Sequence, residues 1–295
     1  MLISLDSPQR PEGQGFMATV SGILVAAGHQ VVVSGSGEAE RLAAECGMAI
    51  VWDGEGDPMS RIGVMKKTPI LRLDSGWLSP ADTFQMAFGG LNALSRWSWG
   101  FQGPSTRLSR PPTPDGCGYA LVILQDPLDS GVARFSPWFR TQEGLLAHVS
   151  SQSARRLLAW APEGVRVSLG AMTEKVDLIA PGALEHALTG ADFVATINSK
   201  YAVQAIADGK PVLCFGHSCY RHRNVVYCLD DRLLPTWQAI RNCESGYHLG
   251  CLDLDWQQGF ISLLQANQLP RRMLGSALKR TISKISKVKS ATAQL

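Results

Sequence analysis

The segment from Asp192 to Tyr220 constrains the fold of this 295-residue chain more than any other stretch. It divides into five consecutive pieces: a buried strand (193–197), a polar corner (Asn198-Ser199), a helix (200–208), a Gly-Lys-Pro turn (209–211) and a second buried strand (212–215). Parallel strands need a crossover connection of this kind, usually through a helix. The segment therefore predicts a parallel α/β sheet.

The polar corner is where this unit can bind a ligand. Ser199 is a residue type that caps helices, and a helix beginning there places free backbone N–H groups at the carboxyl edge of a strand. Phosphate and nucleotide groups bind at such places in α/β proteins. An ordinary crossover without a ligand has the same spacing, so both interpretations stay open at this point.

The length and a proline-rich segment predict two domains. A chain of 295 residues exceeds the usual size of one domain. Arg107–Gly118 contains three prolines and two glycines and precedes a new strand, so it is the best linker. We expect domains at 1–112 and 113–265, followed by a terminal segment at 266–295.

The chain opens as a βαβ unit. A strand at 2–5 leads into a loop that contains Gly13 and Gly15, then a helix at 16–27 and a strand at 30–34. We expect the two glycines to let this loop approach reacting groups. The GxGxxG spacing of dinucleotide sites is missing, which disfavours a Rossmann dehydrogenase.

Asp74 is the candidate catalytic residue. It follows a predicted strand at 70–73 and precedes Ser75-Gly76-Trp77. A carboxylate at the carboxyl end of a strand can act as a general base or orient a hydroxyl, although a turn aspartate has the same sequence context. The aromatic stretch 84–101 either faces sugar or base rings or packs between domains.

The second half repeats the α/β pattern. A strand at 119–124 ends on Gln125-Asp126, which places polar groups at another carboxyl edge. Further predicted elements are helices at 139–153 and 182–188, strands at 157–160, 165–169 and 225–228, and a helix at 233–242.

The terminal segment is strongly basic. Residues 271–295 hold seven basic residues and no acidic one, whereas the whole chain carries a net charge of +3. Five apolar residues recur there at near-helical spacing: Leu274, Leu278, Ile282, Ile285 and Val288. The segment Arg271–Lys289 is thus predicted to form a basic amphipathic helix. It packs on the protein core, contacts an anionic membrane surface, or binds nucleic-acid phosphates.

The cysteines indicate no metal site. The seven cysteines form no CxxC pair, and their spacing with the histidines matches no standard zinc pattern. No apolar run is long enough to cross a bilayer, and the first residues do not look like a secretion signal. We expect reduced thiols in a cytoplasmic protein, with peripheral attachment to the inner membrane face as the alternative.

Five short motifs follow one another in the segment 198–220: Asn198-Ser199, Gln204-Ala205, Gly209-Lys210-Pro211-Val212, Gly216 and Tyr220. In this order they resemble the signature of the capsule polysaccharide biosynthesis glycosyltransferases, the Kdo transferases of bacterial capsule assembly. Leu71–Ser79 resembles the family's acidic-Gly-Phe-Leu-Arg-Ser segment, and Leu124–Ser130 resembles its Gln…Asp-Ser segment. Gly13–Phe16 with Leu24–Val31 is similar to the first βαβ unit of GT-B glycosyltransferases.

The resemblance implies a GT-B-like α/β fold with two Rossmann-like domains and a cleft between them. It implies transfer of a sugar from a nucleotide sugar to a polymeric or glycolipid acceptor, with no cofactor and no metal. The donor-binding residues would be Asn198, Ser199, Gln204, Gly216, His217, Tyr220, Gln125 and Asp126. Asp74 would be catalytic, and Gly13, Gly15 and Trp77 would line the acceptor side.

Three departures leave the substrates open. Gln204 stands where the family has a glutamate, the arginine of its Arg-Ser pair is missing, and its Lys-Pro-His-Pro strand end has no counterpart. The donor is therefore left as CMP- or UDP-linked. Two alternatives remain: a DNA glycosyltransferase acting on hydroxymethylated bases, and a non-catalytic protein that binds sugar nucleotides.

Overall fold

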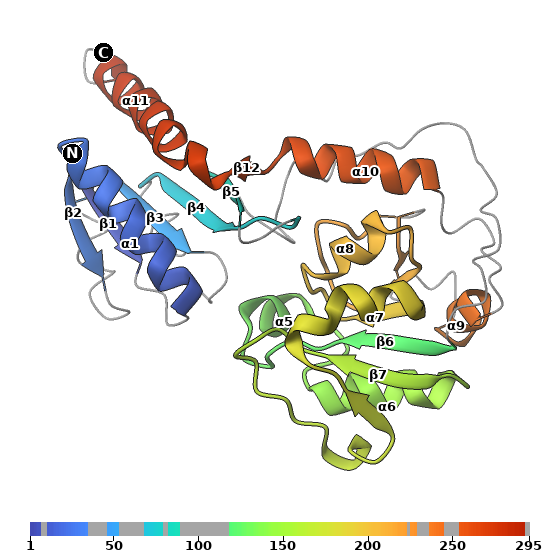
Figure 1. The fold of residues 1–295 in the computed structure, drawn as a ribbon. Helices are drawn as coiled ribbons and strands as arrows, with labels where there is room; N and C mark the ends of the chain where they lie inside the picture. The colour runs from blue at the N-terminus through green and yellow to red at the C-terminus, as the bar shows by residue number, and fades with distance from the viewer. Residues whose placement is uncertain are drawn as a thin grey trace. The chain divides into compact units, whose positions relative to one another are not determined.

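A computed structural model of the chain describes residues 1–6, 11–34, 46–52, 68–78, 82–88, 118–222, 225–228, 236–244 and 254–292. The chain divides into two compact units (Figure 1). The first unit combines Met1–Leu91 with Asn267–Leu295, and the second comprises Asn92–Ala266.

The first unit is a six-stranded sheet in the order β12-β5-β4-β3-β1-β2. Its elements are β1 (Leu2–Asp6), α1 (Pro11–Ala26), β2 (Gln30–Ser34), β3 (Met48–Trp52), β4 (Ile70–Ser75), β5 (Thr83–Ala87), β12 (Leu269–Pro270), a 3₁₀ turn (Arg271–Met273) and α11 (Leu274–Thr292). Strands β1 to β4 are parallel, and β5 runs antiparallel to both β4 and β12.

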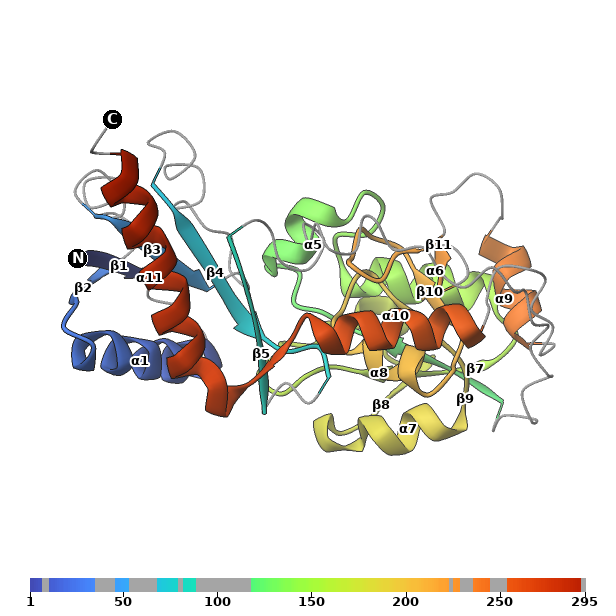
Figure 2. The same ribbon diagram turned by 90° about the horizontal axis from the view of Figure 1, so that it is seen from above.

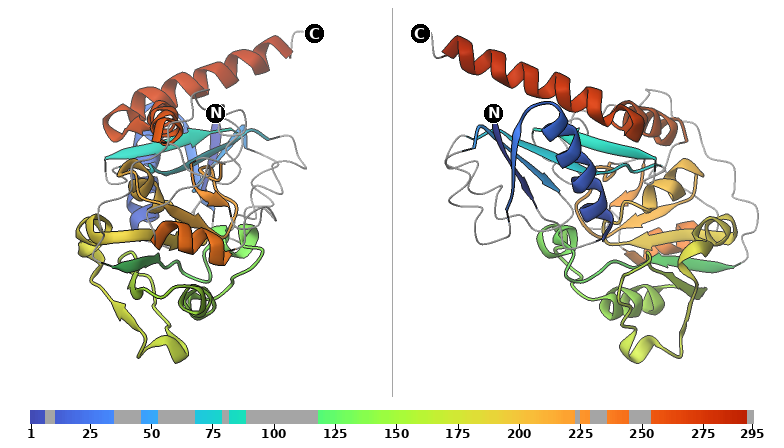
Figure 3. Two further views of the ribbon diagram at one scale, coloured as in Figure 1. Left: turned by 90° about the vertical axis from the view of Figure 1, so that its right-hand side faces the viewer. Right: turned by 60° about the vertical axis from the view of Figure 1, so that its left-hand side comes forward.

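Two helices far apart in sequence complete the core of this unit. α1 and α11 lie against each other (Figures 2 and 3). Phe16 and Val20 of α1 share one buried cluster with Leu274, Leu278 and Ile282 of α11. Burying a side chain of this size contributes about 1.5–3 kcal/mol to the stability of the protein. The apolar stripe of α11 therefore packs in the core of the first unit.

The second unit is a fully parallel sheet in the order β11-β10-β9-β6-β7-β8. Its elements are β6 (Tyr119–Ile123), α5 (Ser130–Phe135), α6 (Gln142–Gln152), β7 (Arg156–Trp160), β8 (Val176–Leu178), α7 (Leu184–Gly190), β9 (Ala191–Thr196), α8 (Ala202–Ala207), β10 (Val212–Cys214), β11 (Tyr227–Cys228), α9 (Thr236–Glu244) and α10 (Leu254–Ala266).

In chain order these strands lie 3-2-1-4-5-6, the order of doubly wound nucleotide-binding sheets. The order reverses between β6 and β9, where the chain crosses from one half of the sheet to the other. α6 lies on one face of the sheet and α7 on the other (Figure 1). Ligands of such sheets bind at the carboxyl ends of the strands at this switch point.

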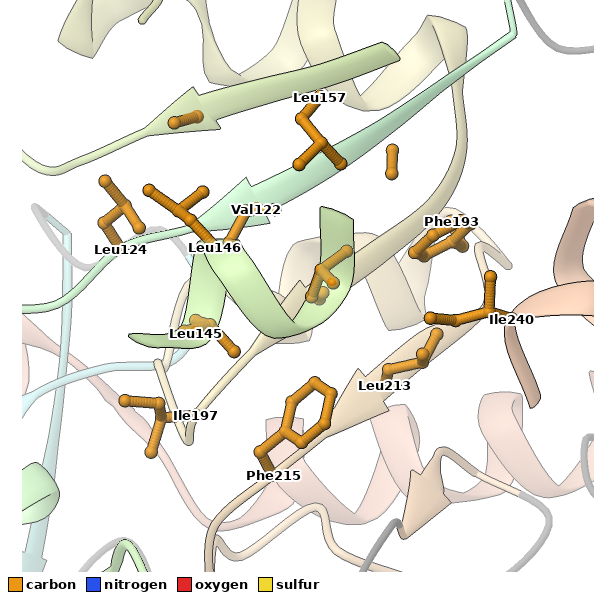
Figure 4. Close-up of a cluster of buried hydrophobic side chains, with 14 of the residues drawn as sticks. Val122, Leu124, Leu145, Leu146, Leu157, Phe193, Ile197, Leu213, Phe215 and Ile240 are labelled. Carbon is orange, nitrogen blue, oxygen red and sulfur yellow. The ribbon is translucent and has the colours of Figure 1, made fainter. Parts of the chain in front are cut away.

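The core of the second unit lies between the sheet and the helices α6 and α9. Figure 4 shows the apolar side chains that fill it: Val122, Leu124, Leu145, Leu146, Leu157, Phe193, Ile197, Leu213, Phe215 and Ile240. All of them are at most 4% exposed. The residues immediately after β6 and β9 are therefore held on a closely packed support.

The predicted α/β fold with two parallel-dominated sheets is confirmed. The strand–helix–strand unit predicted at 193–215 is present as β9, α8 and β10. The predicted boundary at 112/113 and the residues Trp97, Trp99 and Phe101 lie outside the described residues. The terminal segment is not separate, because α11 completes the core of the first unit.

Three local predictions are wrong. Ser199 does not cap α8, because the N-cap position is Tyr201 and no side-chain hydrogen bond caps this helix. Gly13 and Gly15 lie in the first turns of α1 instead of a loop, because Phe16, Met17 and Val20 anchor a helix that already begins at Pro11. Residues 165–169 form no strand, since the Ser168 N–H donates to the side chain of Gln142. Helices α5 and α10 were not predicted. Among the described helices, none is long and apolar enough to cross a bilayer.

Candidate functional site

Two amide side chains bridge the switch point of the second unit. Gln125 follows β6 and Asn198 follows β9, 73 residues later. The Gln125 Nε2 group donates to Asn198 Oδ1 over 2.9 Å, and the Asn198 backbone N–H donates to Gln125 Oε1 over 3.0 Å. This reciprocal pair, which we call the amide bridge, joins the two halves of the sheet at its carboxyl edge.

Asn198 also ties two further segments to this edge. Its Nδ2 group donates to the carbonyl of Gly131 at the start of α5 over 2.9 Å. It donates as well to the carbonyl of His217, after β10, over 3.1 Å. Both hydrogens of this amide group are thus in use, so Asn198 fixes the positions of four segments instead of offering its amide to a ligand.

The loop after β10 passes close to its neighbours at Gly216. The Gly216 N–H donates to the Ile197 carbonyl, and the His217 N–H donates to the Phe135 carbonyl, each over 2.8 Å. A Cβ atom on Gly216 would lie 3.0 Å from the Phe135 oxygen and 3.1 Å from the Ile197 oxygen. Only glycine fits without displacement, while the His217 side chain remains exposed.

Ser199 and Tyr220 are buried at the Asn198-Ser199 corner and are joined by a hydrogen bond. The Tyr220 hydroxyl, in a side chain only 1% exposed, donates to the Ser199 carbonyl over 2.8 Å. Burial raises the pKa of Tyr220 well above its ordinary value, so the phenol stays protonated as this donor. Ser199 is also buried, and its Oγ accepts from the Tyr201 N–H at the turn before α8. Tyr220 thus positions the corner instead of presenting its hydroxyl to a ligand.

Arg221 is a functional candidate that the sequence reasoning missed. Its Nη1 atom lies 3.4 Å from Nδ1 of His217. Burial, and then the charge of Arg221, lower the pKa of His217. The signal that would have found it is charge: the described residues 197–203 and 215–222 contain Lys200, His217, Arg221 and His222, and no acid.

The carboxylates on the β6 side of the switch point shape the chain locally. Asp126 Oδ1 accepts from the Leu128 N–H over 2.9 Å, and Asp129 Oδ1 caps α5 by accepting from the Gly131 N–H over 2.7 Å. Gln204, on α8, donates to Asp208 Oδ1 one turn further along over 3.0 Å.

Gln142 is a second residue that the sequence reasoning missed. It is 4% exposed, and its Nε2 donates to the carbonyls of Gln125 (2.9 Å) and Arg166 (3.1 Å). Its Oε1 accepts from the Ser168 N–H over 2.6 Å. Gln142 therefore holds the backbone under the amide bridge. The sequence signal for Gln142 was its position at the start of a helix, directly after the capping Thr141.

Lys210 of the Gly-Lys-Pro turn lies at the opposite edge of the sheet. It precedes β10, and its Nζ donates to the carbonyls of Thr189 (2.7 Å) and Ala191 (3.1 Å), where α7 ends and β9 begins. A cation stabilises the negative end of a helix dipole. Lys210 therefore stabilises the fold. The similarity of the Gly-Lys-Pro turn to the family signature is explained by this structural role.

In the first unit, Asp74 lies inside β4, near the carboxyl end of the strand. The sequence pattern predicts a strand that ends at residue 73, directly before Asp74. It is 4% exposed and stands opposite Gln85 of β5. Its Oδ1 accepts from the Ser75 N–H over 2.7 Å and from the Ser75 hydroxyl over 3.3 Å. Arg72 precedes it by two residues, so the two side chains share one face of the strand.

Trp77 packs inside the first unit. Its side chain is 4% exposed, and its backbone N–H donates to Gln268 Oε1 over 3.1 Å. Next to it, a Cβ on Gly76 would clash with Thr83 Oγ1, so the turn after β4 requires glycine. In α1, Gly13 is buried and Gly15 is exposed.

Among the described residues, no group of three or more His, Cys, Asp or Glu side chains is arranged to hold a metal ion. Burial raises the pKa of the Cys214 and Cys219 thiols, which keeps them protonated and makes them poor metal ligands. The five cysteines in the described part of the chain form no disulfide bond with one another.

No protein-family model and no curated protein sequence matches the chain. Among solved structures, it resembles the KpsC β-Kdo 2,7-transferase of Thermosulfurimonas dismutans, with a TM-score of 0.54 and 17% identity over 89% of this chain and 99% of that chain. The chain has the fold of a Kdo transferase.

A second solved structure agrees with this assignment of the fold. The KpsC β-Kdo 2,4-transferase of the same organism gives a TM-score of 0.50 and 16% identity, over 85% of this chain and 91% of that chain. The GT-B-like fold predicted from the sequence is thereby confirmed.

Proposed function

We propose that this protein is a nucleotide-sugar-dependent glycosyltransferase whose donor nucleotide binds at the carboxyl edge of the second unit. The observation that carries this proposal is the amide bridge of Gln125 and Asn198, at the switch point of a doubly wound sheet. Nucleotides bind at such switch points, and the chain shares its fold with two Kdo transferases.

The β6–α5 connection argues against a dinucleotide-dependent enzyme. Residues 125–131 read QDPLDSG and contain one glycine, so they cannot form the glycine-rich turn that lets a pyrophosphate approach the backbone. Asp129 occupies the start of α5 as its cap. A carboxylate there repels phosphate, so we place the nucleotide beside the Asn198-Ser199 corner.

The reaction needs a proton acceptor for the attacking hydroxyl. Transfer breaks the bond between the anomeric carbon and the phosphate oxygen, and the electron pair leaves with the nucleotide. The acceptor oxygen bonds to the anomeric carbon, and its proton passes to a base. We assign this role to Asp74, whose carboxylate lies near the carboxyl end of β4.

Replacing Asp74 tests this assignment. Asp74→Asn keeps the shape of the side chain but removes the base, and we expect transfer to slow by about 10²–10⁴-fold. The nucleotide affinity should stay near that of the parent. Because the buried Asp74 carboxylate also accepts hydrogen bonds from Ser75, the melting temperature is measured to verify that the variant still folds. Asp82→Asn, the same change at an exposed acid of the same unit, is the control. Full transfer activity in Asp74→Asn would remove Asp74 from the mechanism.

The donor is identified by thermal shift. A ligand that binds only the native state stabilises it by about 2.7 kcal/mol at about 100 times its Kd. CMP-, UDP-, GDP- and dTDP-linked sugars are compared, since Gln204 pairs with Asp208 and leaves the nucleotide preference open. We expect one class to raise the melting temperature. No shift with any of them contradicts the proposed function.

For the acceptor we propose a polymeric glycan or a glycolipid. A DNA acceptor is the second candidate, because α11 exposes the basic residues Arg272, Lys279, Arg280 and Lys284. Transfer assays with a glycan primer and with a duplex containing hydroxymethylated cytosine separate the two. Binding of a sugar nucleotide without transfer or donor hydrolysis would instead indicate a non-catalytic binding protein.

A further inference from the structure

We propose that Arg221 and His217 together hold the negatively charged phosphate of the donor nucleotide. This inference rests on the proposed function and adds the residues that recognise the charge. The resemblance implies His217 as a donor-binding residue, and the geometry of the loop after β10 adds Arg221 beside it.

The position of His217 is fixed by its backbone. Its N–H donates to the Phe135 carbonyl over 2.8 Å, and its carbonyl accepts from Asn198 Nδ2 over 3.1 Å. The residue before it is held to Ile197 by a further hydrogen bond. His217 is therefore anchored at the carboxyl edge, next to the amide bridge, while its imidazole is exposed.

Arg221 approaches the same imidazole. The Nη1–Nδ1 distance of 3.4 Å brings a guanidinium against a ring that becomes a cation when protonated. Burial and the charge of Arg221 lower the pKa of His217, so the ring is neutral at pH 7. A phosphate oxygen bound beside both groups would accept hydrogen bonds from each, and arginine matches phosphate geometry through its planar fork.

The charge distribution favours an anion on this side of the switch point. The described residues 197–203 and 215–222, after β9 and β10, include Lys200, His217 and Arg221 and no acid, whereas Asp126 and Asp129 follow β6. Opposite charges within about 4–6 Å stabilise each other's ionised forms, and like charges do the reverse. A phosphate is therefore repelled from the β6 side and attracted to the β10 side.

The end of β7 does not supply a cation. The family that the sequence resembles has Lys-Pro-His-Pro there, whereas this chain has Trp160 and Ala161, both buried. The Trp160 Nε1–H is bound to the Pro181 carbonyl over 2.7 Å. With Lys200, the loop after β10 therefore supplies positive charge beside the amide bridge.

The test is isothermal titration of the nucleotide released by the donor that the thermal-shift screen selects. Arg221→Gln and His217→Gln should each weaken binding by about tenfold or more, the loss expected when a charged hydrogen bond to phosphate is removed. Arg156→Gln is the matched control, because Arg156 begins β7 at the opposite edge and pairs with the exposed Asp177. Melting temperatures of the free variants verify that they fold.

Proton uptake provides an independent readout. Arg221 is a charged group that acts on His217, and α5, whose Phe135 carbonyl accepts from the His217 N–H, carries Arg134 and the capping Asp129. The pKa of free His217 is lowered, and a bound phosphate raises it, so binding takes up a proton and weakens as the pH rises through the bound-state pKa. Titrations in buffers of different ionisation enthalpy should show this uptake in the parent and not in His217→Gln.

The outcomes separate the two claims. Nucleotide binding that is unchanged in both Arg221→Gln and His217→Gln overturns this inference and leaves the proposed function standing. Absence of nucleotide binding to the parent protein overturns both. Weaker binding in the two variants with unchanged binding in Arg156→Gln supports the phosphate site. If Arg221→Lys binds the nucleotide more tightly than Arg221→Gln but less tightly than the parent, then both the positive charge and the planar guanidinium of Arg221 contribute to affinity.

Discussion

The two edges of the sheet in the second unit use their polar residues in opposite ways. At the amino edge, Arg155 pairs with Asp192 over 2.9 Å, and Lys210 donates to the carbonyls that end α7. At the carboxyl edge, Gln125 and Asn198 pair through neutral amides, and the neutral imidazole of His217 lies beside the Arg221 guanidinium. The amino edge satisfies its charges internally, whereas the carboxyl edge concentrates positive charge where a ligand can meet it.

This difference shows how a single strand–helix–strand segment can serve two purposes. Residues 208–211 and 191–192 close the crossover and stabilise the sheet. Residues 198–199 and 216–221 build the candidate site. Substitutions at the two edges should therefore separate stability from nucleotide binding, and the predictions below are ordered by the size of the expected effect.

The largest effect is expected at Asn198. Asn198→Asp replaces the NH2 group, which donates two hydrogen bonds, with one oxygen that faces the carbonyls of Gly131 and His217. Unmade hydrogen bonds and repulsion should destabilise the unit by about 2–4 kcal/mol and weaken nucleotide binding by about 100-fold or more. Urea unfolding and titration measure the two effects. A variant that binds nucleotide as the parent does would show that the amide bridge is not part of the site.

Gly216→Ala should give the next largest effect. Its methyl group would lie 3.0 Å from the Phe135 oxygen, so α5 or the loop after β10 must move by a few tenths of an ångström. We expect a cost of about 1–3 kcal/mol and an affinity about tenfold lower. Gly182→Ala, at a glycine with open space around it, is the control. Equal affinity for the two variants would contradict the close approach.

At the amino edge, Asp192→Asn should change stability alone. Asp192 is 7% exposed and its partner Arg155 is 38% exposed, so solvent screens part of the pair. We expect a loss of about 1–2 kcal/mol and an unchanged nucleotide Kd. Denaturant unfolding and titration are the measurements. A weaker nucleotide affinity in Asp192→Asn would contradict the claim that only the carboxyl edge takes part in nucleotide binding.

Lys210→Met should have the smallest effect of the four. The substitution keeps the length of the stem and removes the hydrogen bonds to Thr189 and Ala191. A loss of about 1 kcal/mol is expected, with no change in transfer rate. If transfer slows by tenfold while the fold persists, then the lysine of the Gly-Lys-Pro turn has a role in the reaction.

The sequence predicted the elements whose signals are local. The strand–helix–strand unit follows from apolar runs separated by Asn198-Ser199 and Gly209-Lys210-Pro211, and it is present as β9, α8 and β10. The apolar stripe of α11 was also recognised, and its first residues are buried in the core. Turn chemistry and helical spacing act within a few residues, so one sequence suffices to read them.

The amide bridge could not be predicted, because it depends on which strands are neighbours. Gln125 and Asn198 were each proposed as donor-binding residues, but their contact arises only when β9 pairs with β6 across the switch point. The strand predicted at Val165–Leu169 is absent for a related reason. Its alternating apolar residues suit a strand, but Gln142, 26 residues away from Ser168, takes the backbone N–H instead.

Hydrogen–deuterium exchange with the selected nucleotide tests the central claim most directly, because it reports on both edges in one experiment. The nucleotide should slow exchange in peptides that cover 196–204 and 215–222, and leave the amino edge at 189–193 and 208–211 unchanged. Protection confined to the amino edge, or absent from both edges while titration shows binding, would place the nucleotide elsewhere and contradict the assignment.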